Sequence, residues 1–66
     1  MKFVWIYNEI ESGKIEVYAT KKLLLENNFK EKKQRIEVVG ENSYEIYNKF
    51  DPDIPIAFID RKLVRE

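Results

Sequence analysis

The sequence predicts a small α+β domain, in which an antiparallel sheet of four to five strands carries one helix on one face. Several short segments, apolar throughout or alternating with polar residues, are typical of strands. One segment of good helix formers follows a threonine that fits a helix N-cap. With 66 residues, two glycines and two prolines, the chain allows one domain over residues 1–66 and argues against a linker.

Two strands are expected at the N-terminus. Residues 3–7 (FVWIY) are apolar on both faces, which is typical of a central strand or of a strand whose second face meets a partner. Residues 14–20 alternate, with Ile15 and Val17 on one face. The link between the two segments ends at Gly13, which favours a hairpin.

A helix is expected next. Thr20 has the side chain of an N-cap, and the helix formers of residues 21–26 follow it. Asn28 fits the left-handed position after a helix end, because asparagine tolerates that backbone conformation. A helix that continues through Lys33 is the alternative.

A second hairpin follows the helix. Residues 34–39 alternate between apolar and charged side chains, and residues 44–47 (YEIY) have the composition of a fourth strand. Between them, residues 40–43 (GENS) are a strong turn signal. The order of elements is therefore strand, strand, helix, strand, strand.

A fifth strand is expected near the C-terminus. Residues 54–59 form a last apolar segment, which Pro55 places at a sheet edge or at the start of a strand. Residues 50–53 (FDPD) are expected to form a loop, and residues 60–66 a charged C-terminal tail.

The residue inventory argues against an enzyme. The chain has no Cys and no His, which excludes disulfides, zinc–thiolate sites and the usual general base. Ser12 and Ser43 lie in expected turns, where turn chemistry accounts for them. Asp51 and Asp53 flank a proline in an expected loop and lack a third acidic neighbour, so they make a weak magnesium site. We expect no catalytic residue, no cofactor and no metal ion.

The chain is expected in the cytoplasm, without a membrane contact. Its longest uncharged apolar run, residues 3–7, is too short to span a bilayer. The same run is too short for the apolar region of a signal peptide, and acidic residues follow it.

Aromatic residues suggest the first functional hypothesis. The nine aromatic side chains are ample for so small a core. If the helix covers the face that bears Ile15, Val17 and Ala19, the aromatic side chains of the opposite face stay open. Tyrosine and tryptophan are enriched in the energetic centres of protein interfaces. We therefore expect a protein-binding module, with candidate anchors Trp5, Tyr7, Tyr18, Tyr44 and Tyr47.

Charge suggests an alternative. The net charge is zero, yet residues 21–35 hold six basic and two acidic residues, whereas residues 36–60 hold one basic and six acidic residues. A small nucleic-acid-binding module would use the basic segment, through Lys21, Lys22, Lys30, Lys32, Lys33 and Arg35. A third hypothesis is a structural subunit whose surplus apolar surface is buried in a homo-oligomer such as a homodimer.

The N-terminal third of the chain resembles a layout common in very small phage and mobile-element proteins. Residues 3–7 (FVWIY) followed by residues 15–22 (IEVYATKK) match an aromatic-rich hairpin that runs into a Thr-capped helix. Such proteins often bind a host enzyme, defence complex or polymerase subunit. The resemblance implies an inhibitor that blocks a host or defence protein sterically in the host cytoplasm, and it carries over no individual residue.

Overall fold

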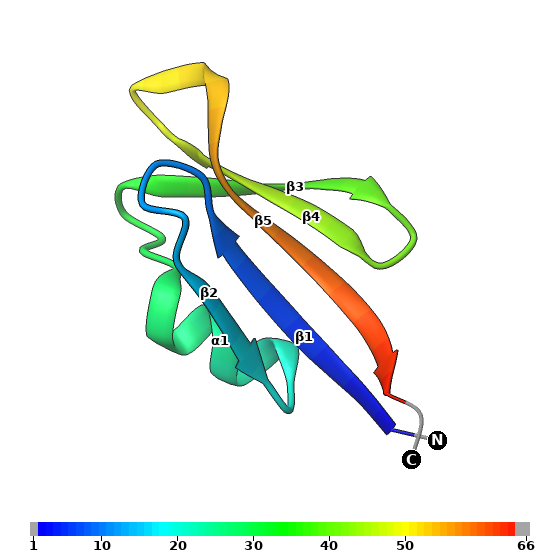
Figure 1. Ribbon diagram of the computed structural model, residues 1–66. Coiled ribbons are helices and arrows are strands. Elements are labelled where there is room, and N and C mark those ends of the chain that lie inside the picture. The colour runs from blue at the N-terminus through cyan, green and yellow to red at the C-terminus, as the bar shows by residue number, and fades with distance from the viewer. Residues whose placement is uncertain (1, 65–66) are drawn as a thin grey trace.

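Five strand-forming segments pair into one antiparallel sheet, in the order β2-β1-β5-β4-β3. The computed structural model describes residues 2–64, and α1 lies against the β1–β2 end of the sheet (Figure 1). The elements are β1 (Lys2–Glu9), β2 (Ile15–Tyr18), α1 (Lys21–Asn28), β3 (Gln34–Gly40), β4 (Ser43–Asn48) and β5 (Asp51–Val64). This confirms the expected α+β class with one helix among the described residues.

Local sequence signals account for both hairpins and for the start of α1. β1 pairs with β2, and β3 pairs with β4, as expected. Gly13 closes the first turn with φ 73°, a backbone conformation that glycine adopts without steric cost. Thr20 caps α1, because its hydroxyl oxygen accepts a hydrogen bond of 3.2 Å from the Leu23 N–H.

The end of α1 differs from the expectation. Asn28 is the last helical residue, and Phe29 follows in an extended conformation. The expected left-handed conformation of Asn28 was therefore wrong. The helix also does not continue through Lys33. The Asn28 amide donates to the Leu24 carbonyl at 3.2 Å and to the Tyr18 hydroxyl at 3.0 Å. With its backbone in the helical conformation, Asn28 makes both contacts, and the one to Tyr18 connects the end of the helix to β2.

β5 is longer and more central than expected. The sequence suggested a loop over residues 50–53, a strand over residues 54–59 and a tail from residue 60, but β5 runs from Asp51 to Val64, and residues 57–64 lie between β1 and β4. β1 is apolar on both faces, and residues 57–64 pair with it along its whole length. Residues 60–64 therefore continue the strand, and residues 65–66 lie outside the described part of the chain.

A β-bulge and the end of the pairing with β1 explain how β5 accommodates a proline. Ile46 pairs with Ala57 and Tyr47 pairs with Pro55, so β5 contributes one extra residue, Ile56, at this point. A bulge interrupts the regular ladder of hydrogen bonds, which removes the need for an N–H at the proline. Pairing with β1 ends at Ala57, so β5 pairs with β4 alone at Pro55. The expected edge position therefore holds at this residue, although β5 is central from Ala57 onward.

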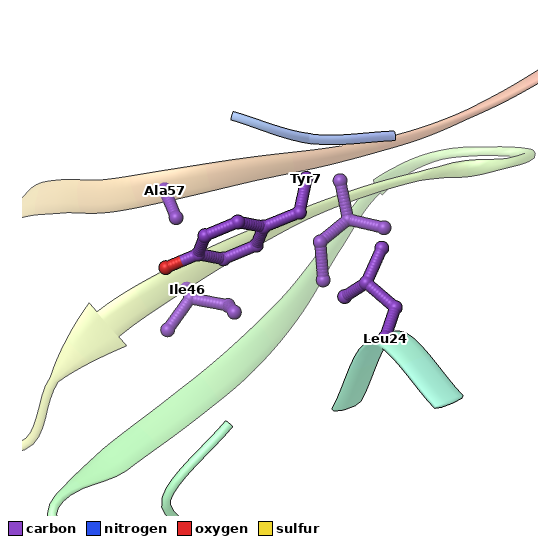
Figure 2. Packing of buried hydrophobic residues seen from close by; sticks show 5 residues of the cluster. Tyr7, Leu24, Ile46 and Ala57 are labelled. Atoms are coloured by element: carbon purple, nitrogen blue, oxygen red, sulfur yellow. The ribbon is translucent and has the colours of Figure 1, made fainter. Parts of the chain in front are cut away.

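The core lies between α1 and one face of the sheet. Leu24 of α1 is fully buried and packs with four side chains from β1, β4 and β5: Tyr7, Ile46, Ala57 and Ile59 (Figure 2). Figure 2 shows Tyr7, Ile46 and Ala57 reaching from three strands into this cluster. We call the side of the sheet that bears these residues the helix face, and the other side the open face.

The helix covers the face opposite to the expected one. Tyr18 lies on the helix face, whereas Ile15 and Val17 point to the open face, where they are 63% and 60% exposed. Cross-strand partners share a face, and Tyr7 pairs with Glu16 on the helix face. An aromatic side chain such as Tyr7 buries about 150–250 Å². Covering the aromatic face therefore removes more apolar area from water than covering the aliphatic face of β2.

Candidate functional site

The open face carries apolar side chains on three neighbouring strands, β2, β1 and β5. Ile6 lies opposite Val17 of β2, while Asn8, one position along the same face, lies between Ile15 of β2 and Phe58 of β5. Apolar residues scattered singly over a surface are normal, but a contiguous group on an uncovered sheet face marks an interaction surface. We call this group the open-face patch: Val4, Ile6, Ile15, Val17 and Phe58.

Carboxylates border the open-face patch on the β4 side. Asp60 lies opposite Ile6, and Glu45 lies opposite Phe58. The Ser43 hydroxyl donates to Asp60 Oδ1 at 2.6 Å, and the Tyr47 hydroxyl donates to Glu45 Oε1 at 2.9 Å. These hydrogen bonds orient the two carboxylates beside the apolar side chains, and the one to Glu45 raises the pKa of Tyr47.

Arg35 forms the outer part of this border. Its guanidinium lies 4.5 Å from the centroid of the Tyr47 ring, and it forms an ion pair with Glu37 of the same strand. Glu37 in turn lies opposite Glu45 of β4. The open face thus carries apolar side chains on β2, on β1 and at Phe58 of β5, and charged side chains at Asp60 and Lys62 of β5, at Glu45 of β4 and on β3.

The structure places four of the five expected aromatic anchors on the helix face. Tyr7 is 4% exposed in the core, and Trp5, Tyr18 and Tyr44 are half-buried around it. The expectation that Tyr18 and its neighbours lie on the open face was therefore wrong. Tyr47 is the one anchor on the open face, where it lies under Arg35. A role of these five residues in partner binding stays a prediction.

Trp5 and Tyr44 already bind a cation of their own chain. Their ring centroids are 6.1 Å apart, and Lys21 Nζ lies 4.7 Å from the Tyr44 centroid and 5.7 Å from the Trp5 centroid. The Lys21 ammonium also donates to the Tyr44 hydroxyl at 3.2 Å. This cation–π contact holds the start of α1 on the sheet.

The basic segment does not form one surface. Lys21 lies over the helix face, whereas Arg35 lies on the open face. The other four basic residues are exposed on α1 and on the turn after it: Lys22, Lys30, Lys32 and Lys33. The sheet therefore separates Arg35 from Lys21.

A cleft of about 640 Å³ with a mixed polar and apolar lining lies on the helix face, between the end of α1, the β1–β2 turn and the start of β5. The Tyr7 hydroxyl donates to Glu9 Oε2 at 3.2 Å in this cleft, and the Ser12 hydroxyl donates to Glu9 Oε1 at 2.7 Å. Burial and Glu9 raise the pKa of Tyr7 to about 12. The hydrogen bonds from Ser12 and Tyr7 lower the pKa of Glu9. At neutral pH the cleft therefore presents a neutral phenol and an ionised carboxylate.

Asp51 and Asp53 both lie in β5 rather than in a loop. Across residues 2–64, no three acidic side chains gather closely enough to hold a metal ion. Over the same residues, α1 is the one helix, and it is too short and too polar to cross a membrane.

Sequence reasoning missed the open-face patch because it assigned Ile15 and Val17 to the face under the helix. A usable signal was present in residues 3–7, whose two apolar faces are typical of a strand that meets a partner. Comparison of the chain with protein families, curated proteins and solved structures finds no match.

Proposed function

We propose that this chain is a non-enzymatic protein-binding module that docks through the open-face patch. The observation that carries the proposal is the exposure of Ile15 and Val17 beside Ile6 on the face that α1 leaves uncovered. Removing such apolar area from water is the main driving force of protein association. An antiparallel sheet can leave one face solvated, but that face is then normally polar.

Charge complementarity defines the partner. Asp60 and Glu45 lie directly beside the apolar side chains of the patch, and their carboxylates are oriented by Ser43 and Tyr47. A matching protein surface presents apolar side chains and a lysine or arginine near Asp60 and Glu45. It also presents an acidic residue near Lys62, which lies opposite Val4. Opposite charges at the border of an interface raise the association rate and fix the orientation of the partners.

The consequence for the partner is steric blockade of the surface that the module covers. The resemblance of the N-terminal hairpin and helix to small phage proteins implies a host or defence protein as the target. That identity stays a prediction, because it depends on the resemblance and not on the geometry of the patch.

The experiment is a pull-down from bacterial lysate, with and without nuclease treatment, using three proteins: the wild type, the double variant Ile15→Glu/Val17→Glu, and the control Leu23→Glu. Leu23 is 45% exposed on α1, away from the open face, so its substitution adds a charge without touching the patch. Circular dichroism and urea unfolding establish that all three proteins are folded. Mass spectrometry identifies the retained protein, and calorimetry measures its affinity.

We expect one stoichiometric protein to bind the wild type and the Leu23→Glu control, and to lose at least about 100-fold in affinity for the patch variant. Retention of the same protein by the patch variant overturns the open-face patch as the docking surface. Retention of nothing, or of material that nuclease removes, overturns protein binding itself. Loss on nuclease treatment would instead favour nucleic-acid binding by the basic segment.

A further inference from the structure

β3 is an edge strand, and the pairing of β4 defines which of its main-chain groups face outward. The Arg61 N–H donates to the Asn42 carbonyl at 3.1 Å, and the Lys49 N–H donates to the Lys33 carbonyl at 2.9 Å. Antiparallel strands direct successive residues alternately toward one neighbour and the other. Because the Lys33 carbonyl accepts from the residue after β4, Arg35, two positions further on, also directs its main-chain groups to β4. Ile36 and Val38 alternate with Arg35, so their main-chain groups point away from the sheet.

The side chains of β3 are complementary to a second copy of the same strand. If two β3 strands pair antiparallel with Ile36 opposite Ile36, Arg35 of each copy lies opposite Glu37 of the other. Both residues lie on the open face, where they already form an ion pair within one chain. The pairing thus creates a cluster of four alternating charges, and opposite charges at facing positions stabilise a strand pair.

We propose that the chain forms a symmetric homodimer through β3, in which two five-stranded sheets join into one continuous sheet. The surface is distinct from the open-face patch and goes beyond the proposed function. In this pairing the Ile36 N–H of each copy donates a hydrogen bond to the Ile36 carbonyl of the other. The Val38 N–H of each copy donates to the Gln34 carbonyl of the other. The Gln34 N–H does not take part, because it already donates to the Lys30 carbonyl at 2.8 Å.

Apolar contact supports the same register. Val38 is 73% exposed on the helix face, and the pairing places it beside the aliphatic stem of Gln34 of the second copy. The half-buried Ile36 meets its equivalent on that face. The twofold axis runs perpendicular to the sheet, so both open-face patches lie on the same side and stay accessible to a partner.

The other edge of the sheet is less suited to a second copy. β2 spans four residues, Ile15–Tyr18, and its one charged residue is Glu16. The nearest opposite charge, Lys14, lies before the strand, so an antiparallel pair of β2 strands could place it opposite Glu16 only beyond the end of β2. A charged edge strand normally discourages pairing, but the alternation of Arg35 and Glu37 discourages it for other sequences and favours it for its own.

The test is sedimentation velocity over micromolar to millimolar concentrations for the wild type, Arg35→Glu and Glu37→Arg. Each single variant places like charges opposite each other at two positions, so we expect its dimer to dissociate about tenfold more readily, or more. An equimolar mixture of the two variants should form a heterodimer, because opposite charges again face each other. The control Lys22→Glu makes the same charge change on α1 and should dimerise like the wild type.

A backbone variant tests the strand pairing itself. Val38→Pro removes an outward N–H while leaving the hydrogen bonds to β4 in place, so it should remain folded and become monomeric. A wild-type monomer at all concentrations overturns the proposal, and so does a mixture of the charge variants that stays monomeric. The patch variant Ile15→Glu/Val17→Glu should keep the dimer. Its dissociation would place the dimer interface on the open face instead.

Discussion

Tyr7 donates a hydrogen bond of 3.2 Å to Glu9, two residues along the same strand, and so links the core to the carboxylate in the cleft beside α1. Residues two apart on a strand share a face, which places the phenol beside the carboxylate. The same spacing recurs on β2, where Tyr18 donates to Glu16 at 2.8 Å, and on β4. These pairs satisfy tyrosine hydroxyls where the rings are packed.

The first prediction concerns the stability that Tyr7 contributes. Tyr7→Phe removes the hydrogen bond to Glu9 and keeps the ring, so the free energy of unfolding should fall by about 1 kcal/mol. Tyr7→Ala also removes the ring from the core and should cost about 3–5 kcal/mol. Urea unfolding measures both values. Equal losses in the two variants would contradict the division between ring and hydroxyl.

The second prediction concerns alkaline pH. The pKa of Tyr7 is raised from 10.0 to about 12 by burial and by Glu9, so the folded state favours the neutral phenol. A raised folded-state pKa contributes stability that is fully present below pH 10 and is lost as the pH rises toward 12. Absorbance titration of the tyrosines should show one group that ionises near the upper value, and Tyr7→Phe should remove it. An unchanged titration curve in Tyr7→Phe would contradict the assignment.

The third prediction concerns the packing of α1. Leu24 is fully buried among residues of three strands, whereas its neighbour Leu23 is 45% exposed. Leu24→Ala should lower the free energy of unfolding by about 2–5 kcal/mol. Leu23→Ala makes the same chemical change at the surface and should stay within about 0.5 kcal/mol of the wild type. Similar losses at both positions, measured by urea unfolding, would place a different face of α1 against the sheet.

Local patterns predicted the elements that depend on neighbouring residues. The turn at Gly13, the capping of α1 by Thr20 and the two hairpins are all interactions between residues close in sequence. The end of α1 was placed correctly to within the last turn, but the conformation of Asn28 was not. Its side chain bonds to Tyr18 of β2, and this contact between two elements leaves no local signal.

The candidate site could be predicted only in part. Alternation in residues 14–20 identified Ile15 and Val17 as members of one face, and the apolar run of residues 3–7 indicated a strand with two apolar faces. Neither pattern indicates which face the helix covers. The sequence also could not predict the carboxylates that border the patch, because their position depends on the pairing of Asp60 in β5 with Ser43 in β4.

The sequence by itself determined the class of the domain, the order of its elements and the division of each strand into two faces, because these follow from side-chain period and turn chemistry. The tertiary structure decided two things. It decided that residues 60–64 pair with β1 as part of a long central strand, and that α1 covers Tyr7 and leaves Ile15 and Val17 open. Both outcomes depend on how much apolar surface the elements remove from water together, which is a property of the assembled sheet and not of any one segment.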